Sequence, residues 1–202
     1  MLIGAAVFSI AFFGTYLQYI RLPNVTLEWK SKIDDSLYTP DYTQESGPEL
    51  ALVYIGSSTC TASNAEFLPR TIEKLKLIIK KRAKKHGRSF SAVGIAVDWE
   101  VENGIEYLHK FGRFDEIMTG QKWSNIGALK YMWEDIPGKG GTPQVLVVDH
   151  VLQVPKGQGD VLQYSISNEE LIIRKVGTKE IRQWVERGAP VPMLSSTAEA
   201  QK

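Results

Sequence analysis

The sequence contains very little cysteine or histidine, and this scarcity limits the chemistry open to it. Its 202 residues include one cysteine, Cys60, and three histidines. A single cysteine excludes a disulfide within the chain and a zinc site built from several thiolates. The three histidines are scattered, and no two of them have the spacing of metal ligands. We therefore expect no metal ion and no other cofactor.

An excess of charge of one sign is also missing. Lys and Arg total 24 and Asp and Glu total 23, so the formal net charge is +1. Because no overall positive field attracts phosphates, we expect no nucleic acid partner. The sequence has no Gly-rich phosphate loop and no hydrolase or metalloprotease motif. The hydrophobic share of 43% is nevertheless ordinary for a globular protein.

One long stretch near the amino terminus carries no charged side chain. Residues 2–20 would span roughly 28 Å as a helix, close to the thickness of the hydrocarbon layer. Tyr16 and Tyr19 lie near the end of this stretch, where aromatic rings prefer the headgroup level. The basic region and cleavage site of a signal peptide are missing. We interpret residues 1–21 as an uncleaved single-pass membrane anchor in contact with lipid, with a buried amphipathic helix as the alternative.

The remaining sequence divides into three parts. Residues 22–48 contain three prolines, one glycine and several acidic residues and predict an extended arm; residues 49–188 predict a soluble domain, and residues 189–202 a polar tail. The three cations nearest the anchor lie on its carboxyl side, which favours a cytoplasmic domain. A periplasmic domain is the alternative, because large domains can be translocated despite such charges.

Short apolar runs alternate with helical patterns through the soluble part. Strands are expected at residues 50–55, 90–97, 114–118, 144–148 and 171–176. Helices are expected at residues 60–85, kinked at Pro69, at 102–111, at 123–133, and from a capping Thr178 to Gly188. This alternation is typical of an α/β sandwich with helices on both faces of a mixed sheet.

Three local signals resemble the thioredoxin-like fold superfamily. An apolar strand leads into Cys60 within the segment Val53–Ser63, and Pro69 follows nine residues later. Thr142 and Pro143 precede the apolar run QVLVVD, as a cis-proline turn precedes a strand in that superfamily. Together with the order of elements, the resemblance covers roughly residues 49–187. It implies a three-layer sandwich, a mixed sheet with helices on both faces.

The sequence also departs from that superfamily. The redox motif Cys-x-x-Cys reads Cys60-Thr61-Ala62-Ser63 here, and Tyr54 falls near the position of the buried acid. Residues 151–168 lengthen the hairpin after the cis-proline strand. Dithiol exchange needs a second thiolate to release a mixed disulfide, so this cycle cannot close within the chain.

These observations support several hypotheses about function. The leading one is a membrane-anchored accessory or scaffolding subunit of a multi-subunit membrane complex, an energy-transducing complex among the candidates. The alternative is a monothiol thiol–disulfide oxidoreductase or thiol-binding protein, in which Cys60 is a low-pKa thiolate and Ser63 donates a hydrogen bond to it. A third hypothesis is a peptide-binding chaperone, in which Thr142 and Pro143 present backbone groups to an extended peptide.

Two further surface features bear on partners. A run with six cations in nine residues could bind anionic headgroups or an acidic partner, or could simply be a solvated helix end. These cations are Lys80, Lys81, Arg82, Lys84, Lys85 and Arg88. The aromatic residues Trp99, Trp123, Tyr131 and Trp133 are expected mostly in the core, and one or two on the surface would suggest a binding face.

Overall fold

The computed structural model describes residues 38–39, 45–154 and 164–192 of the chain. The expected anchor at residues 1–21 lies outside the described residues and stays a prediction. None of the helices in the described stretches combines the length and the apolar character needed to cross a bilayer.

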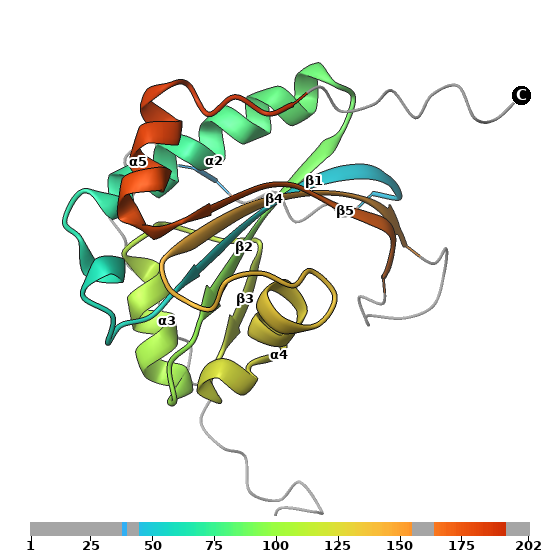
Figure 1. Ribbon diagram of the computed structural model, residues 1–202. Coiled ribbons are helices and arrows are strands. Elements are labelled where there is room, and N and C mark those ends of the chain that lie inside the picture. The colour runs from blue at the N-terminus through green and yellow to red at the C-terminus, as the bar shows by residue number, and fades with distance from the viewer. Residues whose placement is uncertain (1–37, 40–44, 155–163, 193–202) are drawn as a thin grey trace, which may run out of the picture. The chain divides into compact units, whose positions relative to one another are not determined.

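A mixed sheet of five strands forms the middle layer (Figure 1), in the order β3-β2-β1-β4-β5. The strands are β1 (Gly47–Gly56), β2 (Ser89–Ala96), β3 (Glu116–Thr119), β4 (Gln144–Gln153) and β5 (Ser165–Val176). β1, β2 and β3 run parallel, whereas β4 is antiparallel to both of its neighbours. The central strand β1 is almost continuously apolar because both of its faces are covered.

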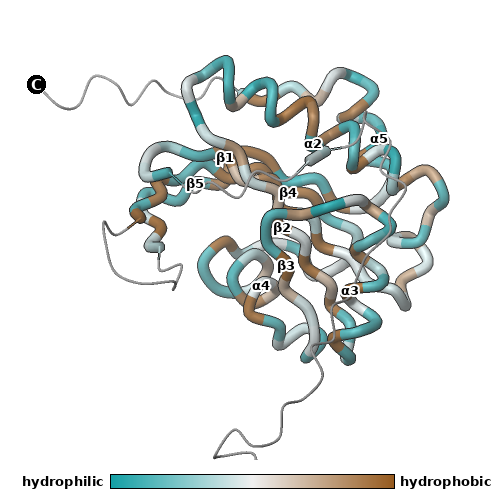
Figure 2. Tube along the Cα trace, turned by 180° about the vertical axis from the view of Figure 1, so that it is seen from behind, coloured by the Kyte–Doolittle hydropathy of each residue, from teal (hydrophilic) through white to brown (hydrophobic). Residues whose placement is uncertain are grey.

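Helices cover both faces of this sheet. Three of them pack on one face with the larger hydrophobic core: α2 (Leu68–Lys85), α3 (Val101–His109) and α5 (Gly177–Glu186). The other face is covered by α4 (Ile126–Ala128) and a π turn (Leu129–Trp133), which follow a 3₁₀ turn (Lys122–Ser124). Hydrophobic and hydrophilic residues alternate along α2, brown and teal in Figure 2, as an amphipathic helix requires. The result is the expected α/β sandwich, a mixed sheet with helices on both faces.

The prediction of one helix from residue 60 to residue 85 is wrong. A 3₁₀ turn at Ala62–Asn64 follows Cys60, and α2 begins only at Leu68. Pro69 therefore lies in the first turn of α2 and does not kink it. A proline is tolerated there because the first N–H groups of a helix have no acceptor within the helix.

Two other helix predictions also need correction. The expected helix at residues 123–133 is divided into a 3₁₀ turn, one turn of α-helix and a π turn. The last helix begins at Gly177, so Thr178 does not cap it. Its N-cap is Val176, whose side chain has no polar atom. Instead Glu180 accepts a hydrogen bond from the backbone N–H of Val176 at 3.3 Å, which satisfies a donor at the helix start.

Tyr38 attaches the expected arm to the domain. Its side chain is buried, and its ring contacts Phe90 edge to face at 5.6 Å between centroids. Its backbone N–H donates to Glu73 at 3.0 Å, and its hydroxyl donates to Asp115 at 2.5 Å. Pro48, which we placed in the arm, belongs to β1.

The chain continues to pack after α5. Ala189 is fully buried, and the indole N–H of Trp184 donates to the carbonyl of Pro190 at 3.0 Å. Arg82 donates to the carbonyl of Gly188 at 2.9 Å. Residues 189–192, which we placed in the tail, therefore pack against the domain. The rest of the tail lies outside the described residues.

Candidate functional site

Cys60 lies just after β1, at the edge of the sheet where the parallel strands end. Its thiol is free and partly exposed, and its backbone N–H donates to the carbonyl of Ser57 at 3.3 Å. The thiol donates to the carbonyl of Thr142 at 3.4 Å, and the peptide bond between Thr142 and Pro143 is cis. The fold thus brings together two segments that lie about eighty residues apart in the sequence.

The surroundings of Cys60 favour the thiolate. Burial raises the pKa of the Cys60 thiol, but hydrogen bonds that the side chains of Thr142 and Ser63 and the backbone N–H groups of Ser63 and Ala62 can donate to the thiolate outweigh it, and the net pKa is lowered. The Ser63 side chain is completely buried, and its hydroxyl has no hydrogen-bond partner within the described part of the chain. That hydroxyl is therefore available to donate to sulfur when the thiolate forms.

A pair of buried tyrosines lies beneath the cysteine turn. The hydroxyls of Tyr54 and Tyr107 share a hydrogen bond of 2.6 Å, and Tyr107 donates to the carbonyl of Ser63 at 3.1 Å. Burial raises the pKa of both tyrosines well above the ordinary value, so neither can act as a base near neutral pH. A Cβ at Gly56 would lie 2.2 Å from the Tyr107 hydroxyl, which explains the glycine there.

Asp98 holds the turn that precedes Cys60. It follows β2, its side chain is buried, and it accepts hydrogen bonds from the backbone N–H and hydroxyl of Ser58 at 3.1 and 2.5 Å. The Ser57 hydroxyl donates to the same carboxylate at 3.3 Å. Our sequence reasoning did not include Asp98 in the site. The signal that could have found it is an acid directly after a buried strand parallel to β1, since the ends of parallel strands meet at one edge.

The loop that carries the cis-proline is fixed from below. Gln144 is fully buried and donates to the carbonyls of Lys139 and Gly141 at 2.5 and 2.7 Å. Arg174 on β5 donates to the Gln144 side chain at 2.9 Å and to the carbonyl of Ile136 at 2.8 Å. Both roles were missed from the sequence: Gln144 opens the run QVLVVD, but no sequence signal indicates that its side chain and that of Arg174 hold the loop. They hold the loop in one position relative to Cys60.

The basic run lies far along α2 from the cysteine turn and divides into two groups. Arg88 forms two hydrogen bonds of 2.8 Å with Asp149, and Arg82 donates a hydrogen bond to the carbonyl of Gly188. The ammonium of Lys80 lies 5.0 Å from the centroid of the Tyr38 ring. The exposed cations of the run are Lys81, Lys84 and Lys85. Half of the run therefore stabilises the domain, and the other half is free to meet a partner.

His150 is buried on β4 between two carboxylates, at the end of β1 opposite Cys60. Its Nε2 lies 3.1 Å from Glu49 Oε1 and its Nδ1 lies 4.0 Å from Glu169 Oε1. Hydrogen bonds from His150 and two serines outweigh the effect of burial and lower the pKa of Glu49. Across the stretches that the structure describes, no group of three or more His, Cys, Asp or Glu side chains could hold a metal ion.

Comparisons with known proteins give only general likenesses. No family model and no curated protein matches the chain. A thiol:disulfide interchange protein from Bacteroides sp. is 14% identical, with a TM-score of 0.34 over 56% of this chain and 76% of that one. Copper-bound yeast Sco1 is 19% identical, with a TM-score of 0.34 over 75% and 83%. A proposed thiol:disulfide interchange protein, DsbE, from Chlorobium tepidum is 12% identical, with a TM-score of 0.37 over 76% and 99%.

Proposed function

We propose that this domain is a monothiol exchange protein that holds its partner as a mixed disulfide on Cys60. The observation that supports the proposal most strongly is the pairing of a partly exposed, low-pKa thiol with a rigid cis-proline loop at 3.4 Å. A thiolate is the nucleophile in thiol–disulfide exchange, and a lowered pKa increases the thiolate fraction at neutral pH.

The proposed reaction needs a second molecule at each step. The Cys60 thiolate attacks one sulfur of a partner disulfide, forms a new sulfur–sulfur bond, and releases the other sulfur as a thiolate. Ser63 stands where a resolving cysteine would be, and a hydroxyl cannot displace the partner. A thiolate from another molecule must therefore attack the mixed disulfide, bond to the partner sulfur and restore the Cys60 thiolate. The mixed disulfide is expected to be long-lived.

Exchange with oxidised glutathione tests this proposal directly. The reduced full chain should gain one glutathionyl group, detected by mass spectrometry, and the Cys60→Ser variant should gain none. Ser63→Ala should raise the thiol pKa, measured from the pH dependence of alkylation, because a hydrogen bond to the thiolate is lost. Ser63→Cys should release the adduct by intramolecular attack. The proposal fails if the thiol of the native chain alkylates no faster at pH 7 than that of the urea-unfolded chain.

A second proposal concerns the whole chain. The uncharged residues 2–20 support a membrane-anchored accessory subunit, and the buried Tyr38 supports it because it fixes the arm to the domain. The positive-inside pattern favours a cytoplasmic domain, with a periplasmic one as the alternative. Purification from membranes in mild detergent should recover partner subunits with the chain. Protease added to sealed right-side-out cells should spare the domain, and digestion there would favour the periplasmic alternative.

A further inference from the structure

Large apolar side chains are exposed around the cysteine edge of the domain. Trp99 is 70% exposed, Trp123 42%, Ile126 74% and Trp133 44%, and we call these four residues the tryptophan surface. The expectation that most of these tryptophans lie in the core is wrong, and only Tyr131 of the four aromatic residues considered is buried. Several exposed tryptophans close together are typical of an interaction site, because burying their apolar surface against a partner is favourable.

The members of this surface are held next to one another. The backbone N–H of Gln121 donates to the carbonyl of Trp99 at 3.2 Å, which joins the loop after β2 to the segment before α4. The rings of Trp123 and Trp133 meet edge to face with centroids 6.2 Å apart. The surface is therefore preformed, and a partner would lose little entropy in ordering it.

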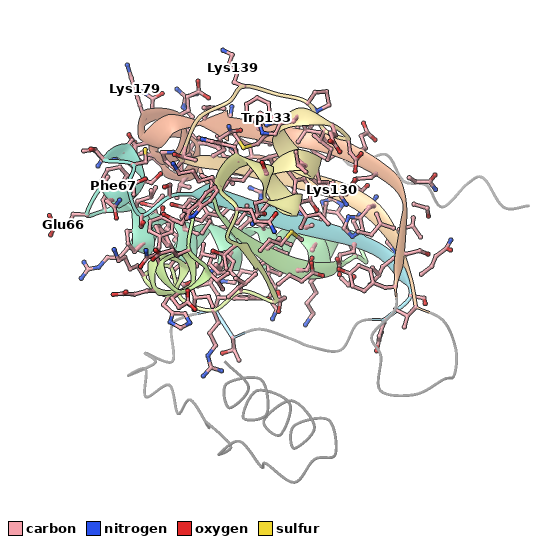
Figure 3. The ribbon with its side chains drawn as sticks, turned by 90° about the horizontal axis from the view of Figure 1, so that it is seen from below. Glu66, Phe67, Lys130, Trp133, Lys139 and Lys179 are labelled. Atoms are coloured by element: carbon pink, nitrogen blue, oxygen red, sulfur yellow. The ribbon has the colours of Figure 1, made fainter. Side chains whose placement is uncertain are left out.

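The tryptophan surface reaches Cys60 from two sides. On one side, Trp99 directly follows Asp98, whose carboxylate holds the turn before Cys60. On the other side, a Cβ at Gly140 would lie 2.6 Å from the Trp133 ring, and Trp133 and Lys139 lie on the same side of the molecule (Figure 3). Gly140 is two residues from Thr142, whose carbonyl accepts from the Cys60 thiol, so the ring lies within roughly 17 Å of the sulfur, the length of about five extended residues.

Tyr38 contacts the domain away from this surface. Tyr38 contacts Phe90, the second residue of β2, whereas Trp99 follows the other end of that strand. The eight residues of β2 span roughly 25 Å. Because the surface adjoins Cys60 on two sides, the occupant that fits it is a molecule whose sulfur reaches Cys60. Glutathione carries no apolar side chain of the size needed to cover several indoles.

We propose that the partner of Cys60 is a polypeptide with a disulfide-bonded cysteine that is flanked, within about five positions, by aromatic or large aliphatic side chains; Cys60 attacks that cysteine, and its former disulfide partner leaves as a thiolate. This inference rests on the proposed monothiol exchange. The tryptophan surface binds the flanking apolar side chains, and the cysteine of the segment exchanges with Cys60 beside the cis-proline loop. Apolar burial supplies the affinity, and the sulfur–sulfur bond captures the bound segment.

Two matched peptides test this inference on the full chain. Each carries one cysteine activated as a disulfide with 2-thiopyridine, flanked by Leu and Phe in one peptide and by Ser and Gln in the other. Attack by Cys60 bonds its sulfur to the peptide sulfur and releases 2-thiopyridone, whose absorbance gives the rate. We expect the apolar peptide to react about tenfold faster, the effect of burying one large side chain.

Variants assign that preference to the surface. Ile126→Ser and Trp133→Ser should each reduce the preference to about threefold or less, while the rate with oxidised glutathione stays unchanged and shows that the fold is intact. Ile117→Ser is the matched control, because Ile117 is 42% exposed but lies on β3 next to Met118 and so faces the other side of the sheet. The preference of Ile117→Ser for the apolar peptide should equal that of the native chain.

The outcomes separate the inference from the proposed function. Equal rates for the two peptides, with normal exchange with glutathione, would overturn the inference and leave the monothiol function standing. Failure to react with any disulfide would overturn both. A third outcome concerns lipid. If brominated lipid quenches the indole fluorescence of the native chain but not of Trp133→Ser, and the two peptides react equally fast, the surface binds a bilayer and the inference is overturned.

Discussion

The buried Lys76 should make the stability of this protein rise between pH 8 and pH 10. The Lys76 side chain is completely buried, and its ammonium donates to Glu73 at 2.7 Å and to the carbonyls of Phe111 and Arg113 at 2.6 and 2.7 Å. The ammonium also lies 3.8 Å from the centroid of the Phe114 ring. Burial nevertheless lowers the pKa of Lys76 to about 8, although Glu73 opposes the shift.

The sign of the effect follows from proton counting. Below pH 8 the Lys76 side chain is protonated in both the folded and the unfolded chain, so it does not make the free energy of unfolding depend on pH. Between its folded pKa of about 8 and its unfolded pKa of 10.5, the unfolded chain binds a proton that the folded chain has released. The free energy of unfolding therefore rises with pH, by up to about 1.4 kcal/mol per pH unit and about 3 kcal/mol in total.

The upper end of this window is set by tyrosines. The pKa values of Tyr54 and Tyr107 are raised by burial, so above about pH 10 the unfolded chain loses tyrosine protons that the folded chain keeps. This contribution lowers stability with increasing pH. The rise due to Lys76 should therefore be measured between pH 8 and pH 10.

Urea unfolding of the full chain in a non-ionic detergent measures the effect. The matched control is the double variant Glu73→Gln, Lys76→Met, which removes both buried charges and keeps an acceptor for the backbone N–H of Tyr38. Between pH 8 and pH 10, the free energy of unfolding of the native chain should rise by about 2 kcal/mol relative to that of the variant. Parallel pH dependence of the two proteins across this range would refute the reasoning.

Three further predictions concern other parts of the domain. Tyr38→Ala should lower the free energy of unfolding by about 3 kcal/mol and Tyr38→Phe by about 1 kcal/mol, since the second change removes only the hydroxyl hydrogen bond; urea unfolding compares the two, and equal losses would contradict the packing argument. Asp98→Ala should slow alkylation of Cys60 at pH 7, because the turn before it loses three hydrogen-bond donations; an unchanged rate would show that Asp98 does not position the thiol. Replacing Lys81, Lys84 and Lys85 together by Gln should weaken binding to anionic vesicles at low salt without changing thermal stability, and binding that is insensitive to salt would exclude this patch as its cause.

The sequence alone located the strands of the central sheet, although β4 continues to Gln153 and β5 begins at Ser165, beyond the apolar runs at 144–148 and 171–176. β1 and β2 are short, continuous apolar runs because they are covered on both faces, and such runs are visible without any structure. The resemblance singled out Cys60 and Pro143 from local signals, a strand that ends at a cysteine and a proline that precedes a strand, and the structure then showed that they lie together. Helix boundaries were less well predicted, since Pro69 can start a helix as readily as it can kink one.

The tertiary structure decided which polar and aromatic side chains meet. Lys76 stands four residues after Ile72 and on the buried face of α2, yet only the folded chain shows that backbone carbonyls from another segment accept its hydrogen bonds. Asp98 and Gln144 acquire their roles in the same way, from partners distant in the sequence. Trp133 is exposed because the helix expected around it divides into short turns, which changes the face that each residue presents. Periodicity indicates which face of a regular element is buried, but it does not reveal the partners that folding brings to that face.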